Sequence, residues 1–313
     1  MNNAPPTPKG FRDIGPEMAR RRRDLINQIV KVLEEFGFVP IETPTLEFAD
    51  TILGKYGDEA DRLVYTFEDR GGRKLAMRYD LTVPLARFVA SNQGLITKEP
   101  FRRYQIGQVF RGENPQKGRF REFTQFDFDS VGSNDPIEDA KIIAAAVKSL
   151  EVLGIKNFKM LINDRTIFSK LVTRAAITED KLPGVIRIID KIKKIGRAGV
   201  VDELIKSGYT QEQATYFLQE IESYPPTQNL QAIFNALKDM GIPDTKYQFS
   251  PTLARGLDYY TGMILEAEIE GYGGGSVGGG GRYDNLIGMF SKKNLPAVGF
   301  SFGLDRMLEI LYP

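Results

Sequence analysis

The chain has 313 residues, of which 42% are hydrophobic and 27% are charged, and its formal net charge is +1. This composition indicates a soluble globular protein of one or two domains, and the small net charge excludes a globally basic nucleic-acid-binding protein. The sequence contains neither Cys nor His, which excludes disulfides, Cys- or His-ligated zinc and a Ser-His-Asp triad.

Any catalysis must therefore use Arg, Lys, Asp, Glu, Tyr, backbone dipoles or the substrate itself. No apolar run approaches the roughly 18–20 residues that span a bilayer. The opening segment, MNNAPPTPKGFRD, lacks the apolar core of a secretory signal. We therefore expect a cytoplasmic protein without membrane contact.

The first predicted element is a helix that follows an extended, Pro-rich segment at 1–15. Pro16 suits the first helical turn, apolar residues recur at helical spacing from Leu25 to Phe36, and Gly37 suits the C-cap. The opposite face carries Arg20 to Arg23. Such a basic run is usually a solvated face, and contact with a nucleic acid is the alternative.

Residues 38–91 predict a strand, a hairpin and a second helix. The strand covers 38–47 and is interrupted by Pro44, which cannot donate to a central ladder, so this strand lies at a sheet edge or an interface. Strand-like runs at 62–69 and 73–79 flank the turn Asp69-Arg70-Gly71-Gly72. Leu81 to Ser91 has the pattern of a helix.

The stretch 102–131 predicts an antiparallel hairpin with a long basic loop. Its two strand-like runs, RRYQIGQVFR and REFTQFDFDSV, flank GENPQKGRF. Alternation in the second run places Phe126 and Phe128 on one face and Gln125, Asp127 and Asp129 on the other. One face of the hairpin is therefore expected to pack apolar residues, while the other presents Arg, Gln and carboxylates.

The middle of the chain predicts a helix at 134–153, a strand at 158–162 and then a change of character. Residues 165–243 carry short helical patterns rich in Lys, Glu and Leu, separated by Pro and Gly breaks. We interpret this stretch as a separate helical insertion domain.

Strands return at 248–271, and a last strand at 297–302 leads into a helix at 303–311. The catalytic domain is therefore predicted in two parts, 1–164 and 244–313. Because strands, hairpins and helices do not follow a strict βαβ order, the pattern predicts an α+β fold, an antiparallel sheet flanked by helices.

The segment between those strands is rich in glycine. Gly273, Gly275 and Gly278 match the pattern G-x-G-x-x-G. A dinucleotide-binding fold also needs a βαβ unit and an acidic residue about 20 positions further on, and that context is missing. The glycines therefore indicate either a close approach of the backbone to a ligand or a tight bend in a sheet.

Four arginines, Arg111, Arg119, Arg255 and Arg306, each lie at the end of a strand-like run or the start of a helix. Taken singly, such a residue is usually exposed or salt-bridged. Several convergent guanidinium groups, however, suit a triphosphate, whose oxygens they bind bidentately. With carboxylates near them in the hairpin, they fit an amino acid and a nucleotide bound together; ordinary polar alternation on a solvated sheet is the alternative.

Several segments resemble the signatures of class II aminoacyl-tRNA synthetases, and specifically the histidyl-tRNA synthetase family. FGFVPIETPTLE resembles motif 1 of the class, FRRYQIGQVFRGENPQKGRFREFTQFDFDSVG resembles motif 2, and AVGFSFGLDRMLEIL resembles motif 3. Blocks similar to those of histidyl enzymes in particular are AMRYDLTVPLARF, ARGLDYYTGMILE and GGGRYDNLIGMF. These blocks disfavour an adenylate-forming domain for another amino acid.

The resemblance implies a role for each candidate residue. Arg111 and Arg255 would contact the ATP α-phosphate from two sides as the catalytic pair, and Arg306 the γ-phosphate. The remaining ATP-site residues would be Arg119, with Glu113 and Phe123 at the adenine. The α-amino group of histidine would be bound by Asp80, Thr82 and Gln125. Its imidazole would be bound by Asp129 and Tyr260, with Tyr283 closing the pocket, and the tRNA acceptor end would meet Asn114, Gln116 and Lys117.

Related enzymes often have Glu where this chain has Asp80 and Asp129, which keeps the charge and shortens the reach. The implied reaction joins histidine to AMP, using ATP and Mg²⁺ without a metal site made of protein ligands alone, and then to the 3′ end of tRNA(His). Motif 1 implies a homodimer. Because the chain stops after motif 3, we expect it to lack the family's anticodon-binding domain; the alternative is a catalytically inactive, histidyl-synthetase-like regulatory subunit of ATP phosphoribosyltransferase.

Overall fold

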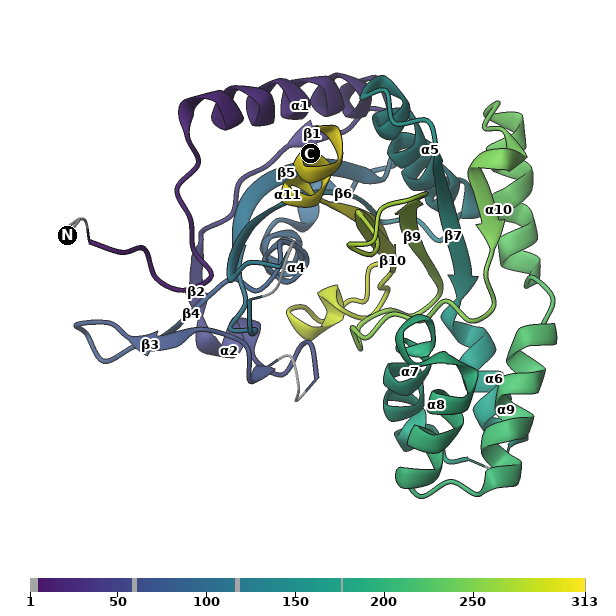
Figure 1. Cartoon of the computed structure of the whole chain (residues 1–313). Coiled ribbons are helices and arrows are strands. Elements are labelled where there is room, and N and C mark those ends of the chain that lie inside the picture. Colours follow the sequence, from purple (N-terminus) through teal and green to yellow (C-terminus); the bar gives the residue numbers. More distant parts are fainter. Residues whose placement is uncertain (1–4, 58–60, 116–118, 176, 313) are drawn as a thin grey trace.

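The computed structural model describes residues 5–57, 61–115, 119–175 and 177–312. Within them, a curved eight-stranded sheet has the order β1-β5-β6-β11-β10-β9-β7-β8 (Figure 1). The pairs β1–β5 and β7–β8 are parallel and the other pairs are antiparallel. The predicted α+β fold with a mainly antiparallel sheet is confirmed. Its strands are β1 (Val39–Pro40), β5 (Phe101–Phe110), β6 (Glu122–Val131), β7 (Phe158–Asp164), β8 (Tyr247–Phe249), β9 (Met263–Ile269), β10 (Gly278–Arg282) and β11 (Ala297–Gly303).

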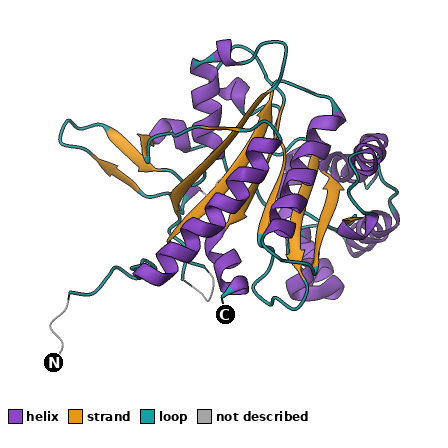
Figure 2. Ribbon diagram, turned by 90° about the horizontal axis from the view of Figure 1, so that it is seen from above, coloured by secondary structure: helices purple, strands orange, loops and turns teal. Residues whose placement is uncertain are grey.

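Helices lie across one face of this sheet (Figure 2). They are α1 (Pro16–Glu35), α5 (Pro136–Val152) and α10 (Gln228–Asp239), and their apolar residues form one buried cluster with Phe126 and Phe128 of β6. The C-terminal helix α11 (Leu304–Leu311) joins the same cluster. Since side chains alternate along a strand, the other face of β6 is left for Gln125, Asp127 and Asp129, as the sequence predicts.

Local signals account for the ends of these helices. Pro16 is the first residue of α1, and Gly37 follows its last turn with a φ of 80°, a conformation that favours glycine. The Asp135 carboxylate accepts a hydrogen bond from the Ile137 amide at 2.9 Å and so caps α5.

A small three-stranded sheet lies beside the large one, in the order β2-β4-β3. It consists of β2 (Leu46–Phe48), β4 (Lys74–Met77) and β3 (Thr66–Glu68), and it packs with α2 (Ala49–Ile52) and α4 (Thr82–Ser91). The predicted hairpin around 69–72 and the predicted helix at 81–91 are confirmed.

The strand predicted at 38–47 is wrong as a single element. The structure has two short strands there, β1 and β2, which belong to different sheets, with Pro44 between them. Prolines at 40 and 44 remove two backbone donors, so a continuous ladder cannot form. The expected edge position is confirmed, because β1 is the outermost strand of the large sheet.

Within the predicted insertion, four helices share a second buried cluster of their own. They are α6 (Arg165–Arg174), α7 (Leu182–Ile189), α8 (Ile192–Lys206) and α9 (Gln211–Ser223), and they lie below the sheet in the view of Figure 1. This cluster also takes in Leu253, Ala254 and Tyr260, so the helices pack directly on the segment that carries Arg255. The fifth helix of the stretch, α10, belongs instead to the main core. No helix in the described ranges is long and apolar enough to cross a membrane.

Candidate active site

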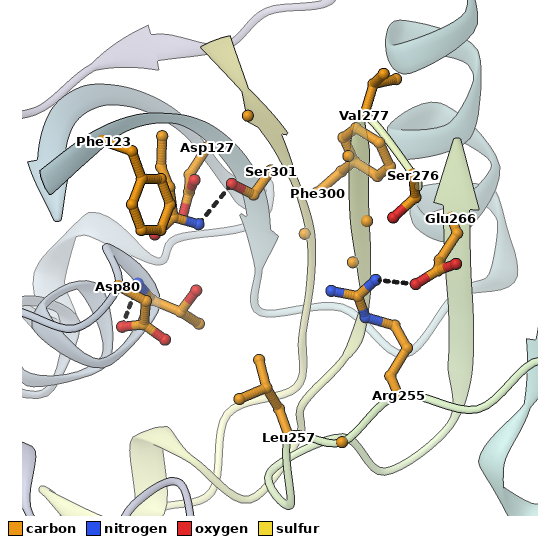
Figure 3. Close-up of a pocket in the computed structure, with 18 of the residues that line it drawn as sticks. Asp80, Phe123, Asp127, Arg255, Leu257, Glu266, Ser276, Val277, Phe300 and Ser301 are labelled. Atoms are coloured by element: carbon orange, nitrogen blue, oxygen red, sulfur yellow. Dashed lines mark hydrogen bonds and ion pairs between the residues drawn. The ribbon is translucent and has the colours of Figure 1, made fainter. Parts of the chain in front are cut away.

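A cavity of about 350 Å³ opens on the polar face of the large sheet (Figure 3). Its volume is within the range of small-molecule sites. Segments far apart in the sequence meet around it, because β6, β11 and β10 are neighbours in the sheet while the residues before α4 and β9 face them.

The structure brings twelve of the predicted site residues to this one cavity. They are Asp80, Thr82, Arg111, Glu113, Arg119, Phe123, Gln125, Asp129, Arg255, Tyr260, Tyr283 and Arg306. Asn114 is exposed on the hairpin loop and is not among the lining residues. Gln116 and Lys117 lie outside the described residues.

We call the part of the cavity around Asp80, Gln125 and Asp129 the acid end. Asp80 sits just before α4, and its Oδ1 atom accepts hydrogen bonds from the Tyr56 hydroxyl at 2.9 Å and from the amides of Thr82 and Val83 at 3.1 and 3.0 Å. Burial raises the pKa of Asp80 above its ordinary value, against these hydrogen bonds. The helix start therefore fixes this carboxylate before any ligand arrives.

Asp129 is held by a buried ion pair. Its Oδ2 atom lies 2.7 Å from Nη2 of Arg103, which is fully buried on β5, and its Oδ1 atom accepts from the Tyr283 hydroxyl at 2.5 Å. Burial raises the pKa of Asp129, while Arg103 opposes that shift. A Cβ atom at position 299 would lie 1.8 Å from Asp129 Oδ1, so only glycine fits opposite this carboxylate.

We call the part around Arg111, Arg119 and Arg306 the arginine end. The Arg111 guanidinium donates to the Tyr79 carbonyl at 3.2 Å and lies 5.0 Å from the centre of the Phe123 ring. Arg119 pairs with Glu113 at 3.4 Å, and Arg306 donates to the Ser276 carbonyl at 2.5 Å. Burial, Arg119 and Arg111 all lower the pKa of Arg306. The contributions of Arg119 and Arg111 reflect the approach of three guanidinium groups, an arrangement that suits an anion.

Arg255 lies against the glycine-rich strand. Its guanidinium pairs with Glu266 of β9 at 2.9 Å (Figure 3), and a Cβ atom at Gly279 would come within 1.9 Å of its Nη1 atom. A Cβ atom at Gly280 would lie 2.0 Å from the Gly299 carbonyl oxygen. The glycines therefore permit close packing within the sheet and a flat surface beside a cavity side chain. In the described part of the chain, the glycine-rich strand β10 pairs only antiparallel, with β9 and β11, so it does not open a βαβ unit of the dinucleotide-binding kind.

Three cavity-region residues were missed in the sequence. Arg103 could have been found, because alternation along β5 places it on the face of Gln105, opposite Asp129. Glu266 and Asp190 line the cavity together with Arg255. They come from β9 and from the end of α7, and no local sequence pattern predicts that these two segments meet at the cavity. Burial, and then Glu266, raise the pKa of Asp190 to about 6.

Comparisons with known proteins identify the family of the chain. The family model described as histidyl-tRNA synthetase matches residues 10–307. A histidine–tRNA ligase from Aeropyrum pernix is 42% identical over 97% of this chain and 74% of its own length, and one from Rhodopirellula baltica is 41% identical over 98% and 74%.

Solved structures are similar over nearly the whole chain. Histidyl-tRNA synthetase from Nostoc is 30% identical, with a TM-score of 0.84 over 99% of this chain and 75% of that one. A Bacillus halodurans protein described as an ATP phosphoribosyltransferase regulatory subunit/histidyl-tRNA synthetase has a TM-score of 0.82 at 23% identity, covering 98% of this chain and 83% of that one. The second likeness concerns the fold alone.

Proposed function

Because the chain belongs to the histidyl-tRNA synthetase family and is a histidine–tRNA ligase, we propose that the cavity is where histidine and ATP react. The observation that carries this proposal is the juxtaposition of the acid end and the arginine end in one cavity. The ammonium group of an amino acid needs negatively charged side chains, and the phosphates of a nucleotide need positively charged ones nearby. The lining of this cavity contains both.

At the acid end, Asp80, Thr82 and Gln125 bind the α-amino group of histidine. Asp129 and Tyr260 bind the imidazole, and Tyr283 closes the pocket. Burial supports this assignment, since a polar pocket of this kind rejects side chains that leave its hydrogen-bonding groups unpaired. The shorter reach of Asp at positions 80 and 129 is compatible with it, because both carboxylates are already held at the cavity wall by their neighbours.

At the arginine end, Arg111 and Arg255 hold the α-phosphate and Arg306 the γ-phosphate. Arg119 joins the phosphates, and the adenine lies on Phe123 with a hydrogen bond to Glu113. The histidine carboxylate attacks the α-phosphorus, a P–O bond forms, and pyrophosphate leaves with the electrons of the bond that breaks. No protein nucleophile takes part; the residues position the reactants and stabilise the charge that develops on the phosphate oxygens.

Mg²⁺ would arrive with ATP. The described residues contain no group of three or more Asp or Glu side chains that could hold a metal ion. Mg²⁺ commonly takes one or two carboxylates together with substrate phosphates, and Glu266 and Asp190 could supply them. The ion would offset charge on the pyrophosphate.

In the second step the terminal ribose hydroxyl of tRNA(His) displaces AMP from the histidyl-adenylate. The loop with Asn114, Gln116 and Lys117 is proposed to meet the acceptor end, which agrees with the exposure of Asn114 between β5 and β6. We further propose a cytoplasmic location, on the grounds of composition.

A homodimer is proposed through the motif 1 region. Val39, Leu46 and Phe48 are exposed by 48%, 42% and 58%, and they lie on β1 and β2, each of which is the outermost strand of its own sheet. Light scattering during size-exclusion chromatography should give a dimer, and Phe48→Glu should shift it toward the monomer. A wild-type monomer at micromolar concentration would contradict the dimer.

The activity is tested by histidine-dependent ATP–pyrophosphate exchange on the purified chain. Exchange should require histidine and should not occur with other amino acids. A chain that binds histidine without any exchange would behave like the regulatory subunit instead and would overturn the proposed chemistry.

A further inference from the structure

Asp127 lines the acid end of the cavity, but the roles proposed above leave it without a task. It lies between Gln125 and Asp129 on the same face of β6, opposite Ser301 of β11 and Gln105 of β5. Its side chain is 2% exposed, and Figure 3 shows it beside Ser301. A buried carboxyl group at a ligand cavity requires a partner.

The hydrogen-bond inventory of the acid end shows which acceptors are still open. The Oδ1 atom of Asp80 already takes three donors, and both Asp129 oxygens face a donor. By contrast, Gln125 Oε1 and Asp127 Oδ1 are buried and have neither a hydrogen bond nor an ion pair among the described residues. Asp129 Oδ2 also lacks a hydrogen bond, but it is paired with Arg103. The two open acceptors, on Gln125 and Asp127, lie on alternate residues of one strand. A single ligand group that carries several N–H donors would satisfy both of them.

The orientation of Gln125 is fixed by the neighbouring strand. Its Nε2 atom donates to the Ser301 hydroxyl at 2.8 Å, which leaves its Oε1 atom as the free acceptor. The Ser301 hydroxyl also forms a hydrogen bond with the Asp127 carboxyl group, which lowers the pKa of Asp127. Gln125, Ser301 and Asp127 are therefore connected by hydrogen bonds.

The charges point to the same donor. Arg103 faces Asp129 and balances one negative charge, and Gln125 is neutral. A buried ammonium group needs a carboxylate that is not already in a direct ion pair. Arg103 pairs directly with Asp129, whereas Arg103 and Arg78 act on Asp127 only at longer range, so Asp127 meets this requirement better. We infer that Asp127 is a second carboxylate ligand of the histidine α-ammonium group, which it holds together with Gln125. This inference rests on the proposed binding of histidine at the acid end.

The test compares two ligands that differ in the ammonium group. Histidinol carries the ammonium and imidazole groups but no carboxylate, whereas 3-(imidazol-4-yl)propionate carries the imidazole and the carboxylate but no ammonium group. Asp127→Asn keeps the shape of the side chain and removes its charge. It should weaken histidinol binding by about 10–100-fold, the usual loss for a hydrogen bond to a charged group. Binding of the propionate should change by less than about 3-fold, because this ligand has no ammonium group to interact with Asp127.

A pH profile separates pairing of charges from simple packing. Burial raises the pKa of Asp127 to about 7; Arg103 opposes this shift, and Asp129 and Asp80 reinforce it. The other groups that face Asp127 are Arg78 and Tyr283. In the wild type, the affinity for histidinol relative to the propionate should therefore rise between about pH 6 and pH 8, as Asp127 ionises. In Asp127→Asn this ratio should stay constant.

Calorimetry on the whole chain gives both affinities without relying on turnover. Glu138→Gln serves as the matched control. Glu138 is a buried carboxylate that pairs with Arg102 at 2.6 Å and is not among the residues that line the cavity. In this variant, the ratio of the affinities for histidinol and the propionate should equal that of the wild type. Equal weakening of both ligands in Asp127→Asn would overturn the inference, and so would unchanged histidinol binding. Loss of exchange in the wild type with normal histidinol binding would sink the proposed reaction and leave the ligand assignment standing.

Discussion

At the acid end of the cavity, Asp80 and Asp129 are buried and each accepts hydrogen bonds or an ion pair from several neighbours. At the arginine end, Arg119 contacts the partly exposed Glu113 carboxylate, and Arg306 contacts the Ser276 carbonyl. The exposed fractions follow the same division: the Arg119 side chain is 58% exposed and Asp129 only 4%. Asp80 and Asp129 at the acid end are therefore fixed by their neighbours, whereas Arg119 and Arg306 at the arginine end are held by contacts that a phosphate can replace.

Under the proposed assignment, this contrast implies that the two substrates are recognised in different ways. Groups fixed in advance cost little reorganisation when the ligand binds, so the acid end can discriminate among amino acids by unpaired polar groups. The arginine end acquires its final arrangement from the nucleotide charge. Substitutions at the acid end should therefore disturb stability and histidine binding together. Substitutions at the arginine side of the cavity should disturb nucleotide binding or the reaction, with little effect on stability.

The largest effect is expected from Arg255→Ala. Removing a cation aimed at the reacting phosphate should lower histidine-dependent pyrophosphate exchange by at least about 100-fold. The circular dichroism spectrum and melting temperature should remain close to wild type. Arg174→Ala, an exposed arginine on α6 outside the cavity, should keep full exchange. Near-normal exchange by a folded Arg255→Ala variant would remove Arg255 from the reaction.

Asp129→Ala should act on both properties of the acid end. It leaves Arg103 buried without its counter-charge, which costs about 3–5 kcal/mol in comparable cases. Urea unfolding should show this loss, and the KM for histidine should rise far more than the KM for ATP. An unchanged histidine KM would exclude Asp129 from the pocket, and an equal rise in both constants would indicate general damage.

Asp127→Asn should change the pH dependence of stability. The folded protein keeps the proton of Asp127 up to about pH 7, whereas the unfolded chain releases it near its ordinary value of about 3.9. Because the folded state binds more protons in this window, Asp127 makes the free energy of unfolding fall as pH rises from about 4 to 7, by up to about 1 kcal/mol per pH unit. The variant should lose this contribution. The measurement is urea unfolding of the wild type and the variant at several pH values. If Asp127 instead stays ionised in the folded protein, the free energy of unfolding would depend on pH in the same way in both proteins.

The smallest effect on stability is expected from Arg119→Ala. The ion pair with Glu113 is largely exposed, so the free energy of unfolding should change by less than about 1 kcal/mol. The KM for ATP should nevertheless rise, because Arg119 belongs to the converging cations. A large loss of stability with an unchanged ATP KM would reverse the division between the two ends.

Much of the fold could be predicted from local patterns. Alternation along 122–131 separates Phe126 and Phe128 from the polar residues that line the cavity, and Asp135 with Pro136 marks the start of α5. The twelve predicted site residues that line the cavity belong to segments that resemble the synthetase motifs. Such patterns work because each is set within one strand or one helix turn.

The remaining features depend on how distant segments approach each other. Glu266 reaches Arg255 only because β9 lies beside β10, and Asp190 reaches the cavity only because α7 packs on the segment before β9. The helical pattern of 228–239 also does not reveal that α10 packs on α5 rather than on α9. No spacing in the sequence encodes these neighbours.

The complete burial of Arg103 joins the histidine pocket to the folding of the sheet. Two of its nitrogens have no hydrogen-bond partner in the described part of the chain, and its Nη2 atom lies against Asp129, so the guanidinium is tolerated only while that carboxylate is present. Loss of Arg103 would unbalance the pocket and the core in one event. A screen that sorts variants by protein yield would then discard changes at this position as misfolded, although the same side chain sets the charge that the amino acid meets.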